Sequence, residues 1–171
     1  MQCLDEAMRS TKRSVGALLV ALALPLVAGA IGSLATGEAG RSWYRTLERP
    51  DWTPPDAVFG PVWTVLYLLM GFASWRVWRK GWDRSDVRVA LGLYAAHLPL
   101  NALWSIIFFG WQRVGLAAIE IVVLLFLIIA ITSRFARIDR LAGALFVPYL
   151  VWVAFATVLN VRIWQLERAF G

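Results

Sequence analysis

Five stretches of this sequence are nearly free of charged residues, and each is about 20 residues long. A helix of that length crosses the apolar core of a bilayer, which is roughly 30 Å thick. Because unpaired backbone groups are costly in lipid, the spanning elements are predicted to be helices. The sequence therefore predicts an all-α integral membrane protein, a bundle of five transmembrane helices over residues 15–34, 58–77, 87–109, 114–131 and 141–161.

The composition supports a chain that lies mostly in lipid. Hydrophobic residues make up 60% of the 171 positions and charged residues only 16%, far from the usage of a soluble domain. One membrane domain over residues 15–171, preceded by a polar tail over residues 1–14, accounts for the chain. The first apolar run also fits a cleaved signal peptide, with Ser33-Leu34-Ala35 as the cleavage site. That run is longer than a usual signal-peptide core, so a retained helix is favoured.

The distribution of basic residues predicts the orientation of the bundle. The net charge is +6, and eleven of the seventeen Lys and Arg residues fall on one side of the predicted membrane. By the positive-inside rule this side is cytoplasmic, so the N-terminus lies there, with loop one and the C-terminus on the opposite side. Most of the basic charge is then an orientation signal that contacts lipid phosphates, and no nucleic-acid partner is predicted. The eleven residues are Arg9, Lys12, Arg13, Arg76, Arg79, Lys80, Arg84, Arg88, Arg134, Arg137 and Arg140.

The first connection, residues 35–57, is the longest and has an unusual composition. Between Trp43 and Pro55 it carries three aromatic residues and three prolines among its charges. Proline fixes φ and disfavours helix in the preceding residue, so this loop is expected to be stiff. Two interpretations fit: a connector whose aromatics anchor in lipid headgroups, or a lid over a cavity between the helices. The prolines favour the lid, because an unstructured tether has little use for them.

Three of the predicted helices each offer a stripe that mixes large aromatic side chains with polar atoms. Spacings of three or four residues place the members of a stripe on one helix face. Such stripes are usually core packing, and Asn and His commonly hydrogen-bond across packed helices for about 1 kcal/mol. Their convergence also suits a flat, mostly apolar ligand, since buried indole and phenol groups need hydrogen-bond partners. The stripes are Trp63 and Tyr67; His97, Asn101 and Trp104; and Pro148, Trp152, Ala156, Leu159 and Asn160.

Glu120 is the acid that lies deepest in a predicted span. An acid at membrane depth is a functional candidate, although snorkelling toward Arg113 is the simpler interpretation. The sequence shows no Ser/His/Asp arrangement and no phosphate-binding glycine loop. Its single histidine has no second strong ligand beside it, so no metal site is predicted.

Small residues predict close contacts between helices. Gly29 and Gly32 are expected to let a neighbouring helix approach the first helix, which Pro25 is expected to kink. Gly92 and Ala96 form a small-xxx-small step, a weak indication of a homodimer.

Aromatic and proline motifs follow one another from the first connection to the last helix. They are Trp43-Tyr44, Arg49-Pro50-Asp51-Trp52-Thr53-Pro54-Pro55, Gly60-Pro61-Val62-Trp63-Thr64-Val65-Leu66-Tyr67, Leu100-Asn101-Ala102-Leu103-Trp104, Phe108-Phe109-Gly110, Pro148-Tyr149-Leu150-Val151-Trp152 and Ala156-Thr157-Val158-Leu159-Asn160. In this order they resemble the signature of the TspO/translocator protein family, the tryptophan-rich sensory proteins related to the peripheral benzodiazepine receptor. The resemblance runs from about Leu24 to Trp164 and is far more specific than a lone motif.

The resemblance implies a five-helix bundle, often dimeric, with a ligand cavity under loop one. In the family this cavity binds porphyrins and isoquinoline carboxamide or benzodiazepine-type drugs. The expected partners are therefore a tetrapyrrole, such as protoporphyrin IX or haem, or an apolar drug-like ligand, together with membrane lipid. No cofactor is expected to be required. Together with the stripes, the resemblance makes the candidate ligand-binding residues Tyr44, Pro54, Pro55, Trp63, Tyr67, His97, Asn101, Trp104, Trp152, Ala156 and Leu159.

The sequence departs from the family pattern at two positions. His97 stands where relatives often have glutamine. A neutral imidazole keeps that hydrogen bond, whereas ligation of a haem iron is disfavoured without a second ligand. Val161 stands where the cholesterol-recognition pattern of animal relatives needs a tyrosine, so sterol transport is not expected.

Three functional classes fit these motifs. The leading hypothesis is a receptor or sensor that binds a tetrapyrrole under loop one. The second is a transporter of porphyrin or lipid, although no pair of broken helices or charged pathway supports it. The third is a light-dependent porphyrin-degrading enzyme, as the resemblance implies for some members, with Trp63 and Trp152 as redox candidates. It lacks a conventional acid-base pair.

Overall fold

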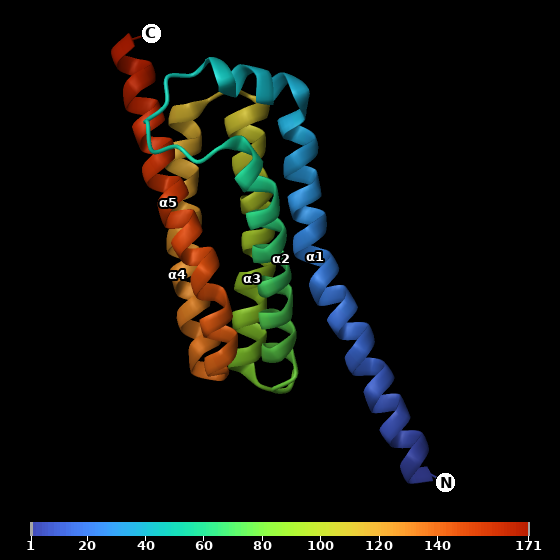
Figure 1. The fold of residues 1–171 in the computed structure, drawn as a ribbon. Helices are drawn as coiled ribbons and strands as arrows, with labels where there is room; N and C mark the ends of the chain where they lie inside the picture. The colour runs from blue at the N-terminus through green and yellow to red at the C-terminus, as the bar shows by residue number, and fades with distance from the viewer. Residues whose placement is uncertain (1, 171) are drawn as a thin grey trace.

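The computed structural model describes residues 2–170, with side chains from residue 13 to residue 169. Within this range each of the five long helices is long and apolar enough to cross a membrane. The predicted all-α, five-span architecture is therefore confirmed, and the two termini lie at opposite ends (Figure 1). Arg9, Lys12 and Cys3 fall outside the described side chains. The elements are α1 (Gln2–Thr46), α2 (Asp56–Trp78), α3 (Ser85–Ser105), a π-helical turn η1 (Ile106–Gly110), α4 (Val114–Ile138) and α5 (Arg140–Phe170).

Helices α2 to α5 form the main bundle, and α1 packs against α2 and α3 before leaning away toward its N-terminus (Figure 1). The turn over residues 111–113 joins α3 and α4, which pack as the antiparallel neighbours that its shortness predicted. Fully buried rings and aliphatic chains fill the bundle, among them Met70, Phe135, Phe146 and Tyr149. Large apolar residues such as Leu19, Val123, Phe126 and Val151 are instead exposed, as a lipid-facing surface requires.

Glycines bring α1 close to its neighbours, as predicted. Gly29 lies against the ring of Tyr67 on α2, and Gly32 lies against Ser105 at the end of α3. Gly71 of α2 faces the backbone of α1, where an added Cβ would lie 2.6 Å from the carbonyl oxygen of Ala21. These contacts fix α1 as one wall of the space between the helices.

The first connection differs from the prediction. Residues 35–46, expected in a stiff loop, continue α1, which is interrupted at Gly37 with a φ of 51°. Glycine adopts positive φ without strain, so residues 38–46 can leave the axis of the preceding helix. The prediction was wrong there because the prolines of the connection begin only at Pro50, and none of residues 35–49 forbids helix.

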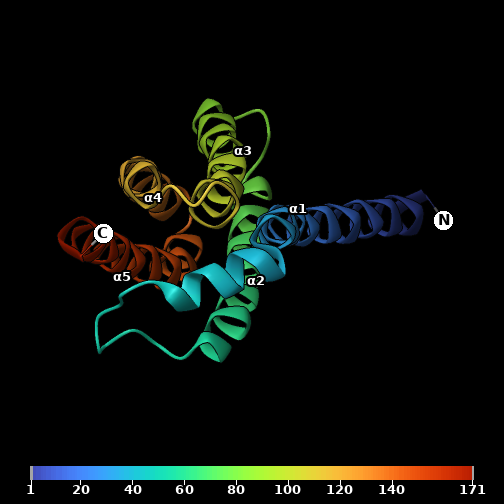
Figure 2. The same cartoon turned by 90° about the horizontal axis from the view of Figure 1, so that it is seen from above.

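The last turns of α1 and the true connection, residues 47–55, pass over one end of the bundle. They run from α1 toward α5 and return to α2 (Figure 2). Trp52 reaches α5, where its ring packs edge-on against Phe155 at a centroid distance of 5.8 Å. Nearer α1, Tyr44 packs edge-on against Phe108 and Phe109 of η1, at 6.0 and 5.7 Å. The segment over residues 38–55 is therefore anchored by aromatic contacts at both of its sides.

Asp139 stabilises the opposite end of the bundle through ion pairs and hydrogen bonds. Its carboxylate accepts hydrogen bonds of 3.0 and 2.9 Å from Nε and Nη2 of Arg76, and lies 2.9 Å from Nζ of Lys80. It also caps α5 by accepting a 2.9 Å hydrogen bond from the Ala142 amide. The hydrogen bond from Arg76 is the main reason that the pKa of the Asp139 carboxyl lies well below its ordinary value. Charges thus join α2 to the α4–α5 turn at this end.

Candidate ligand cavity

A cavity of about 640 Å³ lies beneath the segment that joins α1 to α2. Four parts of the chain form its walls: α1, α2, the junction of α3 with η1, and α5. The wall residues are Leu26, Gly29, Ala30, Ser33, Thr36, Arg41, Tyr44 and Arg45 on α1; Asp56, Ala57, Phe59, Gly60, Trp63, Thr64 and Tyr67 on α2; Trp104, Ser105, Phe108 and Phe109 on α3 and η1; and Trp152, Ala156, Leu159, Asn160 and Ile163 on α5.

Aromatic rings from α2 and α5 form two of these walls. Trp63 stacks on Tyr67 one turn away, with the ring centroids 5.4 Å apart and an interplanar angle of 28°. Phe59, one turn before Trp63, packs edge-on against Trp152 of α5 at 5.8 Å. Residues 59, 63 and 67 recur every four positions, which places all three rings on one face of α2. The cavity is thus bounded by flat apolar surfaces on neighbouring helices.

Hydrogen bonds behind the wall hold some of these rings in place. The hydroxyl of Tyr67 donates a 3.0 Å hydrogen bond to Oδ1 of Asn101, and Nδ2 of Asn101 donates a 3.1 Å hydrogen bond to the hydroxyl of Tyr149. Asn101 is buried and does not belong to the wall. Its two hydrogen bonds join α2, α3 and α5 under the cavity.

A second buried asparagine, Asn160, belongs to the wall itself and fixes it on the η1 side. Nε1 of Trp104 donates a 3.0 Å hydrogen bond to Oδ1 of Asn160, whose Nδ2 donates one of equal length to the Val114 carbonyl oxygen. The ring of Trp104 also stacks on Phe108 at 5.2 Å. This wall is therefore fixed by both packing and hydrogen bonding.

Trp152 differs from Trp104 in its hydrogen bonding. Its Nε1 is buried and has no acceptor within the described part of the chain. Buried donors are nearly always paired in folded proteins. An acceptor on a bound molecule would therefore satisfy this indole.

Seven of the eleven residues predicted to bind ligand line the cavity, and four do not. Those on the wall are Tyr44, Trp63, Tyr67, Trp104, Trp152, Ala156 and Leu159. Asn101 lies behind it. His97 is fully buried in the bundle, where its Nδ1 lies 2.6 Å from the carbonyl oxygen of Tyr94. Pro54 and Pro55 belong to the connection before α2, outside the wall.

Many wall residues were not predicted from the sequence, and for two groups of them the reason is clear. Phe59 and Phe108 lie one turn from Trp63 and Trp104, so the same four-residue spacing was sufficient to find them. Arg41 and Arg45 were missed because residues 35–57 were expected to form a loop, whereas the helix that continues to Thr46 brings both to the cavity.

Glu120 does not snorkel, and that interpretation was wrong. The residue is 9% exposed, and neither carboxyl oxygen has a partner in the part of the chain that the structure describes. It shares the buried face of α4 with Ala117, Ile121 and Leu124. Because it points into the bundle two turns after Arg113, its carboxyl cannot reach that end of the helix.

The sequence matches a known protein family and is similar to several known proteins. Residues 21–165 match the TspO/MBR family. The tryptophan-rich protein TspO of Chlorobaculum tepidum is 41% identical over 150 residues, 88% of this chain and 95% of that protein. The human translocator protein is 39% identical over 136 residues, 79% of this chain and 80% of that protein. The tryptophan-rich sensory protein of Cereibacter sphaeroides is 41% identical over 126 residues, 73% of this chain and 77% of that protein.

Proposed function

Because this chain belongs to the TspO/MBR family, we propose that it is a membrane receptor or sensor that binds porphyrin-type tetrapyrroles and benzodiazepine-site-type ligands in the cavity between α1, α2, α3 and α5. One observation carries the proposal: a cavity of about 640 Å³ has Trp63 and Trp152 on walls from two different helices. That volume is typical of small-molecule sites. The name "sensory protein" of one relative supports a sensing role.

The aromatic walls suit a large, flat and mostly apolar ring system. A tetrapyrrole macrocycle offers two π-faces, which favour offset or edge-on contact with indole and phenol rings. Trp63 and Tyr67 provide such a surface on α2, and Phe59 and Trp152 provide another between α2 and α5. Nε1 of Trp152, which has no acceptor among the described residues, is a donor for an acceptor on the ligand. Asn101 acts indirectly, by holding the hydroxyl of Tyr67.

A titration with protoporphyrin IX tests this proposal. The protein is placed in lipid nanodiscs, and binding is followed by the porphyrin absorption band, so that removal of a tryptophan does not alter the probe. Trp63→Phe and Trp152→Phe are each expected to weaken binding about five- to tenfold, because a smaller ring stacks less and Trp152 also loses its donor. Trp82→Phe, which removes an exposed indole away from the cavity, is the matched control. Unchanged affinity in both cavity variants would overturn the proposal.

Two further assays, one in sealed liposomes and one under illumination, separate the receptor from the other two functional classes. A carrier moves porphyrin into sealed liposomes, whereas a receptor only binds it. A light-dependent enzyme yields porphyrin products under illumination that are absent in the dark, and their formation depends on Trp63 and Trp152. A receptor shows saturable binding without flux and without product.

We also propose that the N-terminus is cytoplasmic and that the cavity opens toward the opposite side. The excess of basic residues on the N-terminal side supports this orientation. In a background in which Cys3 is replaced by serine, Arg162→Cys is expected to react with an impermeant maleimide added to intact cells. Arg79→Cys is expected to react only after lysis. The reverse pattern contradicts the orientation.

A further inference from the structure

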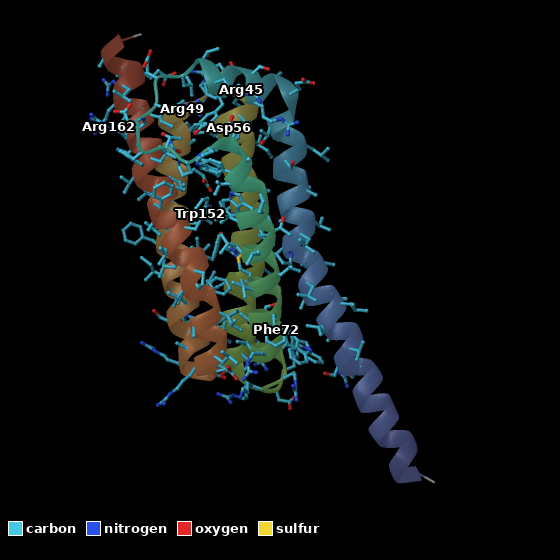
Figure 3. All side chains as sticks on the ribbon, viewed as in Figure 1. Arg45, Arg49, Asp56, Phe72, Trp152 and Arg162 are labelled. Carbon is cyan, nitrogen blue, oxygen red and sulfur yellow. The ribbon has the colours of Figure 1, made fainter. Side chains whose placement is uncertain are left out.

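The cavity combines an apolar interior with charges at one place only, the end of the bundle under the α1–α2 segment. Its charged wall residues are Arg41 and Arg45 from the last turns of α1 and Asp56 from the first turn of α2. Deeper wall positions carry no charged side chain. Figure 3 shows Arg45, Arg49 and Asp56 near this end, with Trp152 farther into the bundle. We call Arg41, Arg45 and Asp56 the mouth.

The charges of the mouth are incompletely balanced. Arg45 lies 3.6 Å from Asp56, and Arg49, just outside the wall, lies 3.3 Å from the same carboxylate. Arg49 also covers the ring of Tyr44, with its guanidinium carbon 4.7 Å from the ring centroid. Asp56 thus faces two guanidinium groups, and Arg41 has no ion-pair partner among the described side chains. Among the charged wall residues, two guanidinium groups stand against one carboxylate, so the wall of the mouth carries a net positive charge.

The start of α2 adds to this positive charge. Asp56 and Ala57, in its first turn, both line the cavity, and no side chain caps the amides there. The first amides of a helix are unpaired within the helix and carry a partial positive charge. An anionic group in the mouth would therefore meet guanidinium groups and helix amides together.

We propose that the mouth recognises carboxylate groups, so that the site prefers amphipathic ligands with an apolar body and an anionic end. This inference rests on the proposed function of the cavity. The ring system lies inside among the aromatic walls, and its carboxylates point out to Arg41 and Arg45. Guanidinium groups suit this task because they donate two parallel hydrogen bonds to one carboxylate. The mouth, rather than the tryptophans, then determines the orientation of the ligand in the cavity.

Asp56 acts against such a ligand. It already occupies Arg45 and Arg49, and a ligand carboxylate must compete with it for these donors. Removing the charge of Asp56 is therefore expected to strengthen the binding of anionic ligands. Both Arg45 and Asp56 are well exposed, with 66% and 47% of their side chains accessible. Screening by water and salt keeps the effect modest.

The test compares protoporphyrin IX, which has two carboxylates, with its neutral dimethyl ester. The measured quantity is the ratio of the two affinities in nanodiscs, compared between variants so that partition into lipid cancels. Arg41→Gln/Arg45→Gln is expected to lower the preference for the diacid about five- to tenfold, and Asp56→Asn to raise it about threefold. The wild-type preference is expected to shrink between 0.1 M and 1 M salt. Arg162→Gln removes a cation at the same end that does not line the cavity and is the matched control.

Each result has one interpretation. Trp152→Phe is expected to weaken the binding of diacid and ester alike, which separates the aromatic walls from the mouth. If both compounds bind the wild type but the ratio is the same in the double arginine variant, the carboxylate proposal is overturned and the proposed function stands. If neither compound binds saturably, the proposed function fails and this inference fails with it.

Discussion

Asn101 accepts a 3.0 Å hydrogen bond from the hydroxyl of Tyr67 and lies behind the cavity wall that Tyr67 helps to form. The asparagine also donates to Tyr149, so three helices meet at one amide. It is therefore a positioning residue for the ring of Tyr67, and not a wall residue itself. This relationship changes what a substitution at Asn101 is expected to do.

Asn101→Leu is expected to destabilise the protein by about 1–3 kcal/mol, because two tyrosine hydroxyls lose their buried partner. Porphyrin affinity is expected to fall only about two- to threefold, since the ring of Tyr67 remains but is less well fixed. Thermal unfolding in one detergent and the nanodisc titration measure the two effects. A large loss of affinity with unchanged stability would show instead that Asn101 contacts the ligand directly.

Asp139→Asn is expected to destabilise the bundle by about 1–3 kcal/mol, because the amide cannot pair with Arg76 and Lys80 as the carboxylate does. Asparagine keeps the cap of α5, whereas Asp139→Ala loses the cap as well and is expected to cost about 1 kcal/mol more. The midpoint temperature of thermal unfolding should be highest for the wild type, lower for Asp139→Asn and lowest for Asp139→Ala. An asparagine variant as stable as the wild type would contradict this role.

The stabilising effect of Asp139 is expected to depend on pH in one direction. Its pKa is lower in the folded protein than the ordinary value of 3.8, mainly because Arg76 donates hydrogen bonds to the carboxylate. The unfolded chain therefore binds the proton first as the pH falls. The contribution is complete above the ordinary pKa and is lost as the pH falls below it. Acid unfolding curves should show that the wild type loses more stability than Asp139→Asn between about pH 5 and pH 2.

Gly71→Ala is expected to destabilise the contact between α1 and α2. The added Cβ would lie 2.6 Å from the Ala21 carbonyl oxygen and 2.8 Å from the Cα of Leu22, so the backbone of α1 must shift. Overpacking of this kind typically costs about 1–3 kcal/mol. Gly16→Ala, where nothing lies within 4 Å, is the control and should be neutral or slightly stabilising. Equal melting temperatures for the two variants would mean that α1 does not pack there.

The sequence was sufficient to predict the spans and the two aromatic walls. In lipid, a charge-free run of this length has few alternatives to a membrane-spanning helix. The four-residue spacings of Trp63 and Tyr67 and of Trp152 and Ala156 place each pair on one helix face. These features are local in the chain, so periodicity reveals them. The same periodicity extended one turn also leads to Phe59.

The sequence was not sufficient where a side chain has two possible environments. His97 and Asn101 share a helix face with Trp104. Not every residue on one helix face reaches the same cavity, however. Only the packing of the neighbouring helices shows that His97 and Asn101 lie behind the wall. Whether Glu120 points toward Arg113 or into the bundle depends likewise on how α4 is rotated about its own axis. The mouth was not predicted because residues 38–46 were expected to form a loop, so Arg41 and Arg45 were not expected on a helix face.

The proposed function requires that the ligand occupies the space beside Ala156 between α2 and α5. The most direct test is to fill that space without removing any tryptophan, by Ala156→Phe, and to titrate protoporphyrin IX into nanodiscs. Val158→Phe adds the same ring two residues away on the exposed face of α5 and serves as the control. This placement of the ligand predicts that Ala156→Phe keeps its helical content but binds porphyrin at least about tenfold more weakly, while Val158→Phe binds like the wild type. Wild-type affinity in a folded Ala156→Phe protein would contradict it.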